Sequence, residues 1–242
     1  AREGGLLRIV PANQCMVGDS LLYDLKMEEA LAEIAEARAL AMRIGDRFCE
    51  MFALQSESYV HWASGRHQEA EAPTHAALDL ARRLGARRYE AILLCVLAEI
   101  RSAQERKEEA EAMLQEAYAI GAETGYGFCG PIICSEFALL KGASADGRAW
   151  VERGIEMLAT ARLAHNDIFF RKAAIDWGIG ASDWRLVNQM CEDLLVLTEA
   201  EPLPYVEFYV DRARALEALD RNPDDTLAVE ALSRLSAQAA AV

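Results

Sequence analysis

The most recognisable chemical motif in the sequence is a GxGxxG run, which residues 125–130 spell as Gly-Tyr-Gly-Phe-Cys-Gly. In dinucleotide-binding proteins this run follows a buried strand and opens a helix whose N-terminus receives the pyrophosphate. Here the pattern before Gly125 is helical, and Pro131 is suited to open the next helix. We therefore expect a connection between two helices at this run and no bound nucleotide.

Histidines and cysteines bind a metal ion only when their spacing fits a coordination geometry. A zinc pair on one helix needs a spacing of three or four residues, and no two histidines have it. Cys129 and Cys134 lack a second pair that would complete a tetrahedron. We expect helix residues rather than metal ligands at all four histidines, which are His61, His67, His75 and His165.

Nucleophilic catalysis requires a serine or cysteine that is held by a base on a well-defined turn. The sequence contains no GxSxG, no Ser-x-x-Lys and no P-loop. Its carboxylates, such as those within residues 107–111, lie mostly on predicted solvent faces. We therefore expect that this chain is not an enzyme and that it carries no metal and no cofactor.

The amino-acid composition limits which classes of partner and which cellular location remain for this protein. The chain has 242 residues, 52% of them hydrophobic, and its 39 acidic and 25 basic residues give a net charge of −14. This charge repels phosphate, so we expect neither a nucleic-acid nor a membrane partner. The longest apolar run, residues 91–98, is too short to cross a bilayer. Six scattered cysteines indicate reduced thiols and a cytoplasmic protein. Because the first residue is Ala rather than Met, we expect a fragment of a larger multidomain protein.

A 40-residue period organises the first half of the chain. Gly45, Gly85 and Gly125 are spaced by this period, and small residues recur in the same register at three further offsets. Agreement at four offsets in three copies indicates a repeat architecture. The three further sets are Gly18, Ser58 and Ala98; Ala30, Ala70 and Ala110; and Ala37, Ala77 and Ala117.

The stretches between the glycines are helical. Apolar residues recur at spacings of three and four, and no stretch alternates long enough to form a convincing strand. Asp46 is predicted to cap a helix from Arg47, and Asn222 to cap one that begins at Pro223. We expect an all-α fold of six antiparallel helix pairs, at residues 11–24 and 27–44, 47–64 and 67–84, 87–104 and 107–123, 130–141 and 146–163, 167–179 and 183–199, and 204–219 and 223–239.

The signature is weaker in the later copies. The connections at residues 141–147 and 201–204 are too short for domain linkers, so we expect one continuous domain over residues 1–242. The second-helix series is expected to continue with Ala149, Val187 and Leu227, and the first-helix series with Ala138 and Ala215.

The small residues have a packing explanation. Two helices approach to about 8 Å only where the side chains at their crossing are small. We expect the series that starts at Gly18 to mark this crossing on each first helix, and the series that starts at Ala30 to face it. Large apolar residues one position earlier would then pack against the next repeat, with Glu57 as the exception. These residues are Val17, Leu97 and Phe137.

This arrangement resembles the tetratricopeptide repeat, in which a large apolar residue precedes a Gly or Ala and two alanines follow seven residues apart. Leu97, Ala98, Ala110 and Ala117 match best. The resemblance covers residues 11 to about 240 and implies a right-handed superhelix that binds proteins. The chain departs from the family in its 40-residue unit, in the absence of a closing proline, and in His61 and Arg101, which replace an aromatic residue.

A second resemblance covers residues 184–216. The run from Trp184 through the Glu-Pro-Leu-Pro of residues 201–204 to Phe208 and Arg212 is similar to the C-terminal repeats of bacterial adenylate or guanylate cyclases with an AAA-type ATPase module. Related regions follow the ATPase module of large helix-turn-helix transcription activators. The resemblance implies a regulatory module of a bacterial signalling protein.

Repeat proteins of this kind bind partners along the wall formed by successive first helices. We expect the groove to be lined by the residues next to each small residue and by those about one helical turn away from it. Acidic and aromatic side chains there favour a basic or apolar segment of a protein and disfavour a terminal carboxylate. The candidate residues are Asp19, Gln55, Tyr59, Trp62, Cys95, Glu99 and Ser102, with Cys15 and Leu22 at the same positions of the first copy.

Two alternatives remain open. The groove could instead be a pocket for a small effector, as in the ATPase-type transcription activators. The array could also be an oligomerisation scaffold, in which Tyr205, Phe208 and Tyr209 pack against a second copy. The sequence does not decide between these alternatives and the protein-binding groove.

Overall fold

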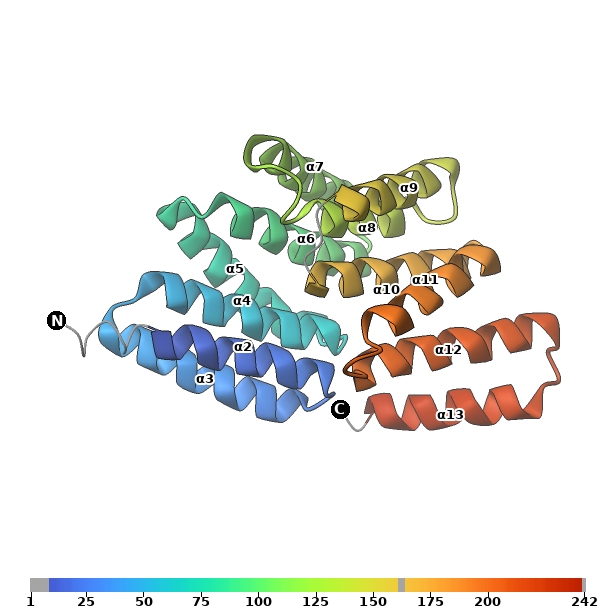
Figure 1. The fold of residues 1–242 in the computed structure, drawn as a ribbon. Coiled ribbons are helices and arrows are strands. Elements are labelled where there is room, and N and C mark those ends of the chain that lie inside the picture. The colour runs from blue at the N-terminus through green and yellow to red at the C-terminus, as the bar shows by residue number, and fades with distance from the viewer. Residues whose placement is uncertain (1–8, 161–163, 241–242) are drawn as a thin grey trace. The chain divides into compact units, whose positions relative to one another are not determined.

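The computed structural model describes residues 9–160 and 164–240, which contain twelve α-helices and no strand (Figure 1). The all-α prediction is therefore confirmed. The chain divides into two compact units, Ala1–Thr124 and Gly125–Val242, each with three helix pairs in its described residues. The single continuous domain and its right-handed turn stay predictions.

The first unit contains three helix pairs of nearly equal length. Within each pair the helices pack along one another, and each later first helix also packs on both helices of the pair before it. The predicted bounds of these six helices agree with the structure to within two residues. The pairs are α2 (Ile9–Tyr23) with α3 (Met27–Ile44), α4 (Arg47–Ala63) with α5 (His67–Leu84), and α6 (Arg87–Ala103) with α7 (Lys107–Thr124).

The second unit repeats the plan with helices of more varied length, from 12 to 18 residues. Its first helices also contact one another in order, α8 with α10 and α10 with α12. Here the predicted bounds differ by up to three residues. The pairs are α8 (Gly130–Lys141) with α9 (Ala145–Thr160), α10 (Ala164–Gly180) with α11 (Trp184–Leu197), and α12 (Pro204–Arg221) with α13 (Thr226–Ala240).

Glycine ends the second helices in the first unit as predicted. Gly45 and Gly85 follow α3 and α5 with φ of 71° and 65°, in the left-handed region that glycine adopts without strain. The amide of Gly45 donates to carbonyl oxygens in the last turn of α3. These turns explain why the glycines recur with the period.

The two predicted helix caps have different outcomes. The Asp46 carboxylate accepts a hydrogen bond from the Cys49 amide at 3.0 Å, which confirms the first cap. The second prediction is wrong, because α13 begins at Thr226 and the Asp225 carboxylate caps it by accepting from the Ala228 amide. Residues 222–225 form a β-turn instead, closed by a bond from the Asp225 amide to the Asn222 carbonyl. Proline at the second position of a turn favours this geometry.

The helix crossings in the first unit lie at the predicted small residues. A Cβ on Gly18 would lie 3.1 Å from the Ala30 carbonyl oxygen and 2.6 Å from the Ile34 side chain. The Ser58 hydroxyl is buried and hydrogen-bonds the Thr74 hydroxyl at 2.6 Å. Ala98 and the three alanines of the second helices are also buried. One expectation is wrong: Val17 is 49% exposed, so it is not buried against the next repeat.

The second unit departs from the prediction at two of the five expected small or apolar positions, Ala149 and Leu227. Ala149 is exposed, and a Cβ on Gly147 would contact the Ala138 carbonyl oxygen, so Gly147 marks the crossing of α8 and α9. Leu227 is 75% exposed, whereas Ala228 is buried. The connections differ in length from those of the first unit, which shifts the register by one or two residues. Val187, Ala138 and Ala215 are buried as predicted.

Candidate functional site

The predicted groove residues occupy repeated positions on the first helices of the first unit. Asp19, Tyr59 and Glu99 are forty residues apart and therefore lie at one position on α2, α4 and α6. Leu22, Trp62 and Ser102 occupy the position three residues later. These helices pack side by side in chain order, so the repeated positions form rows across them.

The structure brings three of these residues together. The Trp62 indole N–H donates a hydrogen bond to the Glu99 carboxylate and thereby links α4 to α6. The Tyr59 ring meets the Trp62 ring edge to face, with centroids 5.4 Å apart. This contact places an aromatic pair beside a carboxylate on neighbouring first helices.

The predicted residues differ in burial. Asp19, Trp62, Glu99 and Ser102 are half-buried. The residues three before each small residue are buried, because on a helix this spacing returns to the face that meets the second helix, and of the residues four after it only Leu22 is buried. We infer that this set supports the wall from within; its members are Cys15, Leu22, Gln55 and Cys95, and Tyr59 is also buried.

Asp19 has unusual electrostatic surroundings. Burial raises the pKa of its carboxyl to about 6, and the nearby Ser56 hydroxyl offsets part of this shift. Burial and the charge of Asp19 together raise the pKa of the Tyr23 hydroxyl one turn away. Asp19 therefore keeps a partly desolvated negative charge at neutral pH, at the same helix position as Glu99.

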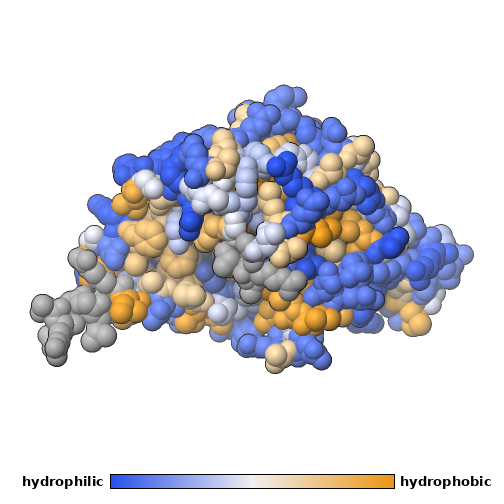
Figure 2. Space-filling view, turned by 45° about the horizontal axis from the view of Figure 1, so that its top comes forward, coloured by the Kyte–Doolittle hydropathy of each residue, from blue (hydrophilic) through white to orange (hydrophobic). Residues whose placement is uncertain are grey.

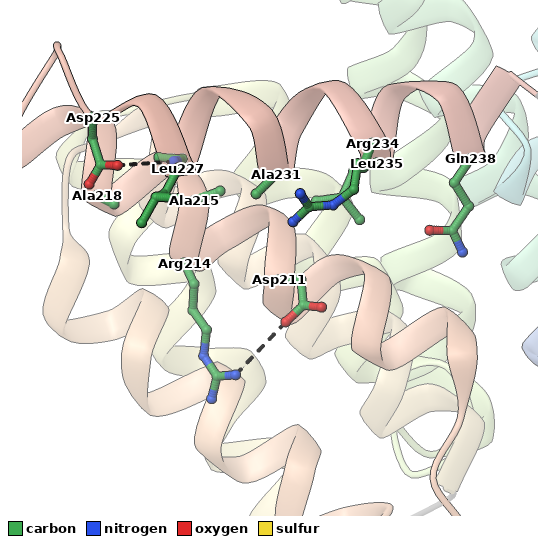
Figure 3. A pocket seen from close by; sticks show the side chains of 11 residues that line it. Asp211, Arg214, Ala215, Ala218, Asp225, Leu227, Ala231, Arg234, Leu235 and Gln238 are labelled. Carbon is green, nitrogen blue, oxygen red and sulfur yellow. Dashed lines mark hydrogen bonds and ion pairs between the residues drawn. The ribbon is translucent and has the colours of Figure 1, made fainter.

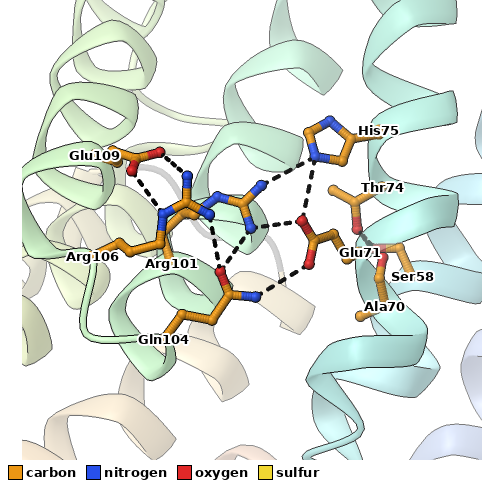
Figure 4. Close-up of polar contacts among 9 residues, drawn as sticks. All are labelled: Ser58, Ala70, Glu71, Thr74, His75, Arg101, Gln104, Arg106 and Glu109. Atoms are coloured by element: carbon orange, nitrogen blue, oxygen red, sulfur yellow. Dashed lines mark hydrogen bonds and ion pairs between the residues drawn. The ribbon is translucent and has the colours of Figure 1, made fainter.

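A polar cluster joins the second repeat to the third (Figure 4). The Arg101 guanidinium on α6 donates to the Glu71 carboxylate on α5 at 2.7 Å and to the Gln104 side-chain oxygen at 3.0 Å. His75 lies 3.3 Å from the same guanidinium. The hydrogen bond from Arg101 lowers the pKa of Glu71. Arg101, which replaces an aromatic residue of the repeat family, thus makes a polar contact between repeats that the sequence analysis missed.

The described residues contain no arrangement of metal ligands. No three His, Cys, Asp or Glu side chains there are placed so that they could hold a metal ion, and the side chain of His165 lies outside the described part of the chain. The GxGxxG run follows helix α7 and precedes α8, so it lacks the preceding strand that a pyrophosphate site needs.

The cysteines have the properties of core residues. All six are buried free thiols. Burial raises the pKa of Cys15 and Cys134 to about 12 and that of Cys191 to about 11. Because the thiolate is the reactive form, these three side chains are inert at neutral pH.

The surface and the helices were also compared with the expectation of a hydrophilic protein without a membrane-spanning segment. The face shown in Figure 2 is mostly hydrophilic, with apolar patches between the charged residues. In residues 9–160 and 164–240, none of the helices combines the length and the apolar character needed to cross a bilayer.

Stacked helix pairs with small residues at their crossings define a helical-repeat protein. Residues 58–123 match the family model described as tetratricopeptide repeat. This region, from the middle of α4 to the end of α7, is therefore tetratricopeptide-like, and the match supports a protein-interaction repeat module. No curated protein matches the chain.

Proposed function

We propose that the first helices of the first unit bind a segment of a partner protein that carries basic and apolar side chains. The observation that carries this proposal is the Trp62–Glu99 hydrogen bond, which holds an aromatic ring and a carboxylate together across two repeats. The family match at residues 58–123 includes both residues.

The charges in these rows support a basic segment. Among the described residues, neither Asp19 nor Glu99 forms an ion pair with a lysine or arginine, although the chain has many such pairs elsewhere. A bound basic side chain would make charge-assisted hydrogen bonds to these carboxylates. The Trp62 ring would cover the aliphatic part of the same side chain.

The test compares two synthetic peptides by fluorescence anisotropy. Both peptides have the same aliphatic residues. At the remaining positions one peptide carries lysine and arginine and the other carries glutamate. We expect the basic peptide to bind more tightly, and Glu99→Gln to weaken its binding roughly threefold to tenfold, because Glu99 is only half-buried.

The matched control is Glu108→Gln on α7, which removes the same charge from an exposed position. We expect it to leave peptide affinity unchanged. Equal affinity for both peptides, or an equal effect of the two substitutions, would contradict the proposal.

We also propose that this chain is a non-catalytic part of a cytoplasmic bacterial signalling protein with a cyclase or ATPase module. The support is the pattern at residues 184–216 together with six buried free thiols, which suit a reducing compartment. In that pattern the Trp184 indole donates to Asp220 at 2.7 Å, and Arg212 pairs with Asp176 at 2.7 Å.

The open reading frame around residue 1 tests this context. A cyclase or nucleotide-binding segment upstream is the expected finding, and a frame without either would overturn it. A metabolite that raises the melting temperature would instead favour the small-effector alternative.

A further inference from the structure

One end of the first unit is basic, although the chain as a whole has a net charge of −14. Because paired helices run antiparallel, the last turns of α3 and α5 and the first turns of α4 and α6 lie at the same end of the unit (Figure 1). Residues 42–48 and 82–89 form these turns and contain six arginines and one acidic residue. The arginines are Arg43, Arg47, Arg82, Arg83, Arg87 and Arg88.

Three of these arginines are exposed and have no carboxylate partner among the described residues. Arg43 forms no hydrogen bond or ion pair with any described residue. Arg83 and Arg88 donate only to backbone carbonyl oxygens, at 3.2 and 3.4 Å. The other three arginines pair with glutamates of the same unit. The guanidinium groups of Arg43, Arg83 and Arg88 are therefore free to donate to a bound anion.

The 40-residue period arranges these side chains in rows. Arg43 and Arg83 occupy one position in the last turns of α3 and α5. Arg88 occupies on α6 the position that Phe48 has on α4. Because α4 and α6 are neighbouring first helices, Phe48 and Arg88 lie on the same side of the unit.

Exposed apolar side chains gather at the same end. The Phe48 ring is 44% exposed and meets the Tyr89 ring edge to face, with centroids 5.4 Å apart. Met42 and Leu84, in the last turns of α3 and α5, are 55% and 42% exposed. Among the described residues of α3 to α7, no other large apolar side chain is exposed. Free arginines and exposed apolar side chains thus share one surface.

The aromatic rings are held in place by two neighbouring repeats. Tyr89 of α6 contacts both Phe48 and Phe52 of α4, and the Phe52 and Tyr89 centroids are 6.2 Å apart. A ring that is already fixed loses less conformational entropy when a partner binds than a mobile side chain does. The Phe48 ring is therefore a suitable contact for an inserted apolar side chain.

The pocket between α12 and α13 in the second unit also contains arginines, but it lacks this uniform sign (Figure 3). Arg214 and Arg234 line it together with Asp211 and Asp225. Arg214 lies 3.9 Å from Asp211, which balances part of its charge. An anionic ligand would meet both signs in that pocket, whereas the end of the first unit presents unbalanced positive charge.

We propose that this end of the first unit binds an acidic segment of a partner protein that carries an aromatic or large aliphatic side chain. Carboxylates of the segment would accept charge-assisted hydrogen bonds from the free arginines. Its apolar side chain would pack on the exposed Phe48 ring. We call this surface the arginine end; it comprises Arg43, Phe48, Arg83, Arg88 and Tyr89.

The arginine end is separate from the surface that is proposed to bind a basic segment. Phe48 lies in the first turn of α4 and Trp62 in its last turn, roughly 21 Å apart along the helix axis at its usual rise. The two surfaces also have opposite charge. The arginine end therefore does not rest on the binding of a basic segment.

A protein segment fits the arginine end better than a nucleic acid does. Glu116 and Glu123 on α7 reach Arg82 and Arg87 from the next repeat and place exposed negative charge beside the free arginines. A nucleic acid carries a phosphate on every nucleotide and would bring some of them against these glutamates. An acidic protein segment can instead place its carboxylates opposite the free arginines and apolar residues elsewhere.

The test measures binding of fluorescent peptides to the full chain by anisotropy. In one peptide glutamates flank a central phenylalanine, and in the comparison peptide glutamine replaces each glutamate. We expect the glutamate peptide to bind more tightly, and its affinity to fall as salt rises from about 0.1 M to about 1 M, because salt screens exposed charges. Arg83→Gln and Arg88→Gln should each weaken its binding roughly twofold to fivefold. Phe48→Ala should weaken both peptides, since it removes the ring on which phenylalanine packs.

Matched controls separate the arginine end from a general effect of charge. Lys107→Gln removes one positive charge from an exposed residue without a carboxylate partner among the described residues, at the opposite end of the unit, and should leave affinity unchanged. Val196→Ala, at a residue 73% exposed in the second unit, is the control for Phe48→Ala. Glu99→Gln should not affect the phenylalanine peptide, and Arg88→Gln should not affect the basic peptide, so the two binding proposals succeed or fail separately.

Several results would overturn the proposal. They are equal affinity for the glutamate and glutamine peptides, equal effects of Arg88→Gln and Lys107→Gln, and unchanged affinity after Phe48→Ala. A single-stranded oligonucleotide that binds more tightly than the glutamate peptide, and that is weakened by Arg88→Gln, would assign this end to a nucleic acid instead. Circular dichroism checks folding, and Phe48→Leu, which keeps an apolar side chain without the ring, replaces Phe48→Ala should that variant unfold.

Discussion

Asp19 holds a negative charge in surroundings that disfavour it. Burial raises the pKa of its carboxyl from 3.8 to about 6. The folded state therefore binds the proton more tightly than the unfolded chain does. The favourable contribution of protonated Asp19 is fully present below about pH 4 and is lost as the pH rises through about 6. Above that range the charged carboxylate lowers the free energy of unfolding.

Asp19→Asn should reveal this cost. We expect the substitution to raise the free energy of unfolding by about 1–3 kcal/mol near pH 7.5, and to have little effect near pH 4. Urea unfolding at both pH values measures the difference. Asp24→Asn is the control, because Asp24 is exposed and pairs with Lys26 at the surface. A gain of equal size at both pH values would show that the charge of Asp19 is not the cause.

The same variant connects stability to the proposed groove. A carboxylate that lowers stability persists where it serves another purpose, and binding of a basic segment is such a purpose. Asp19→Asn is thus expected to weaken binding of the basic peptide while it stabilises the chain at neutral pH.

The candidate-site residues could be predicted from the sequence where the 40-residue period alone determines their position on the first helices. The 40-residue spacing singled out Trp62 and Glu99, which the structure joins by a hydrogen bond. The Arg101–Glu71 pair was missed, because thirty residues separate its members and only the packing of α6 on α5 brings them together. The burial of Gln55 and Cys95 was missed because positions a turn from the crossing share its face.

At the scale of helices, prediction succeeded where the repeat was regular. In the first unit each pair is closed by a turn of constant length, so the glycines and the apolar spacing fixed the bounds. The turn between the two helices of each pair contains one residue with positive φ. That residue is Gly65 in the second pair, but Leu25 and Glu105, both with φ of 60°, in the first and third, so a glycine marks the position only once in the sequence. In the second unit the connections vary, which explains the errors at Ala149 and Leu227.

Gly154 shows how closely the helices of the second unit approach. A Cβ on Gly154 of α9 would overlap the Phe170 ring of α10, and Phe170 is fully buried. A Cβ on Gly147, seven residues earlier, would overlap the Gly142 carbonyl oxygen and the Trp177 indole of α10 and would lie 3.2 Å from the Ala138 carbonyl oxygen of α8. Two glycines thus take the place that two alanines seven apart hold in the first unit.

Gly154→Ala should therefore destabilise the chain although alanine favours helices. We expect overpacking to lower the free energy of unfolding by about 1–3 kcal/mol, reduced by up to about 1 kcal/mol of helix propensity. Gly180→Ala is the control, because a Cβ on Gly180, at the end of α10, meets no atom within 4 Å. Urea midpoints should fall for Gly154→Ala and stay equal or rise for Gly180→Ala; the reverse order would refute the close crossing.

At the scale of the whole molecule, stability in such an array is roughly a sum over helix pairs and the interfaces between neighbours. The first unit contains three complete pairs, which is about the smallest number of repeats that buries a continuous core. Its interface between the second and third pairs includes the bonds of Glu71 to Arg101 and of Arg82 to Glu90. Removing the third pair leaves Glu71 and Arg82 without these partners and exposes the apolar face of α5.

Two fragments test this additivity. We expect residues 1–124 alone to keep helical circular dichroism and one cooperative urea transition, because all three pairs and both interfaces are present. Residues 1–84, which end after α5, should lose most of their helicity or unfold at a much lower urea concentration, since two pairs share only one interface. A fragment 1–84 as stable as 1–124 would mean that each helix pair is stable by itself, and the neighbour interfaces described here would then contribute little to the fold.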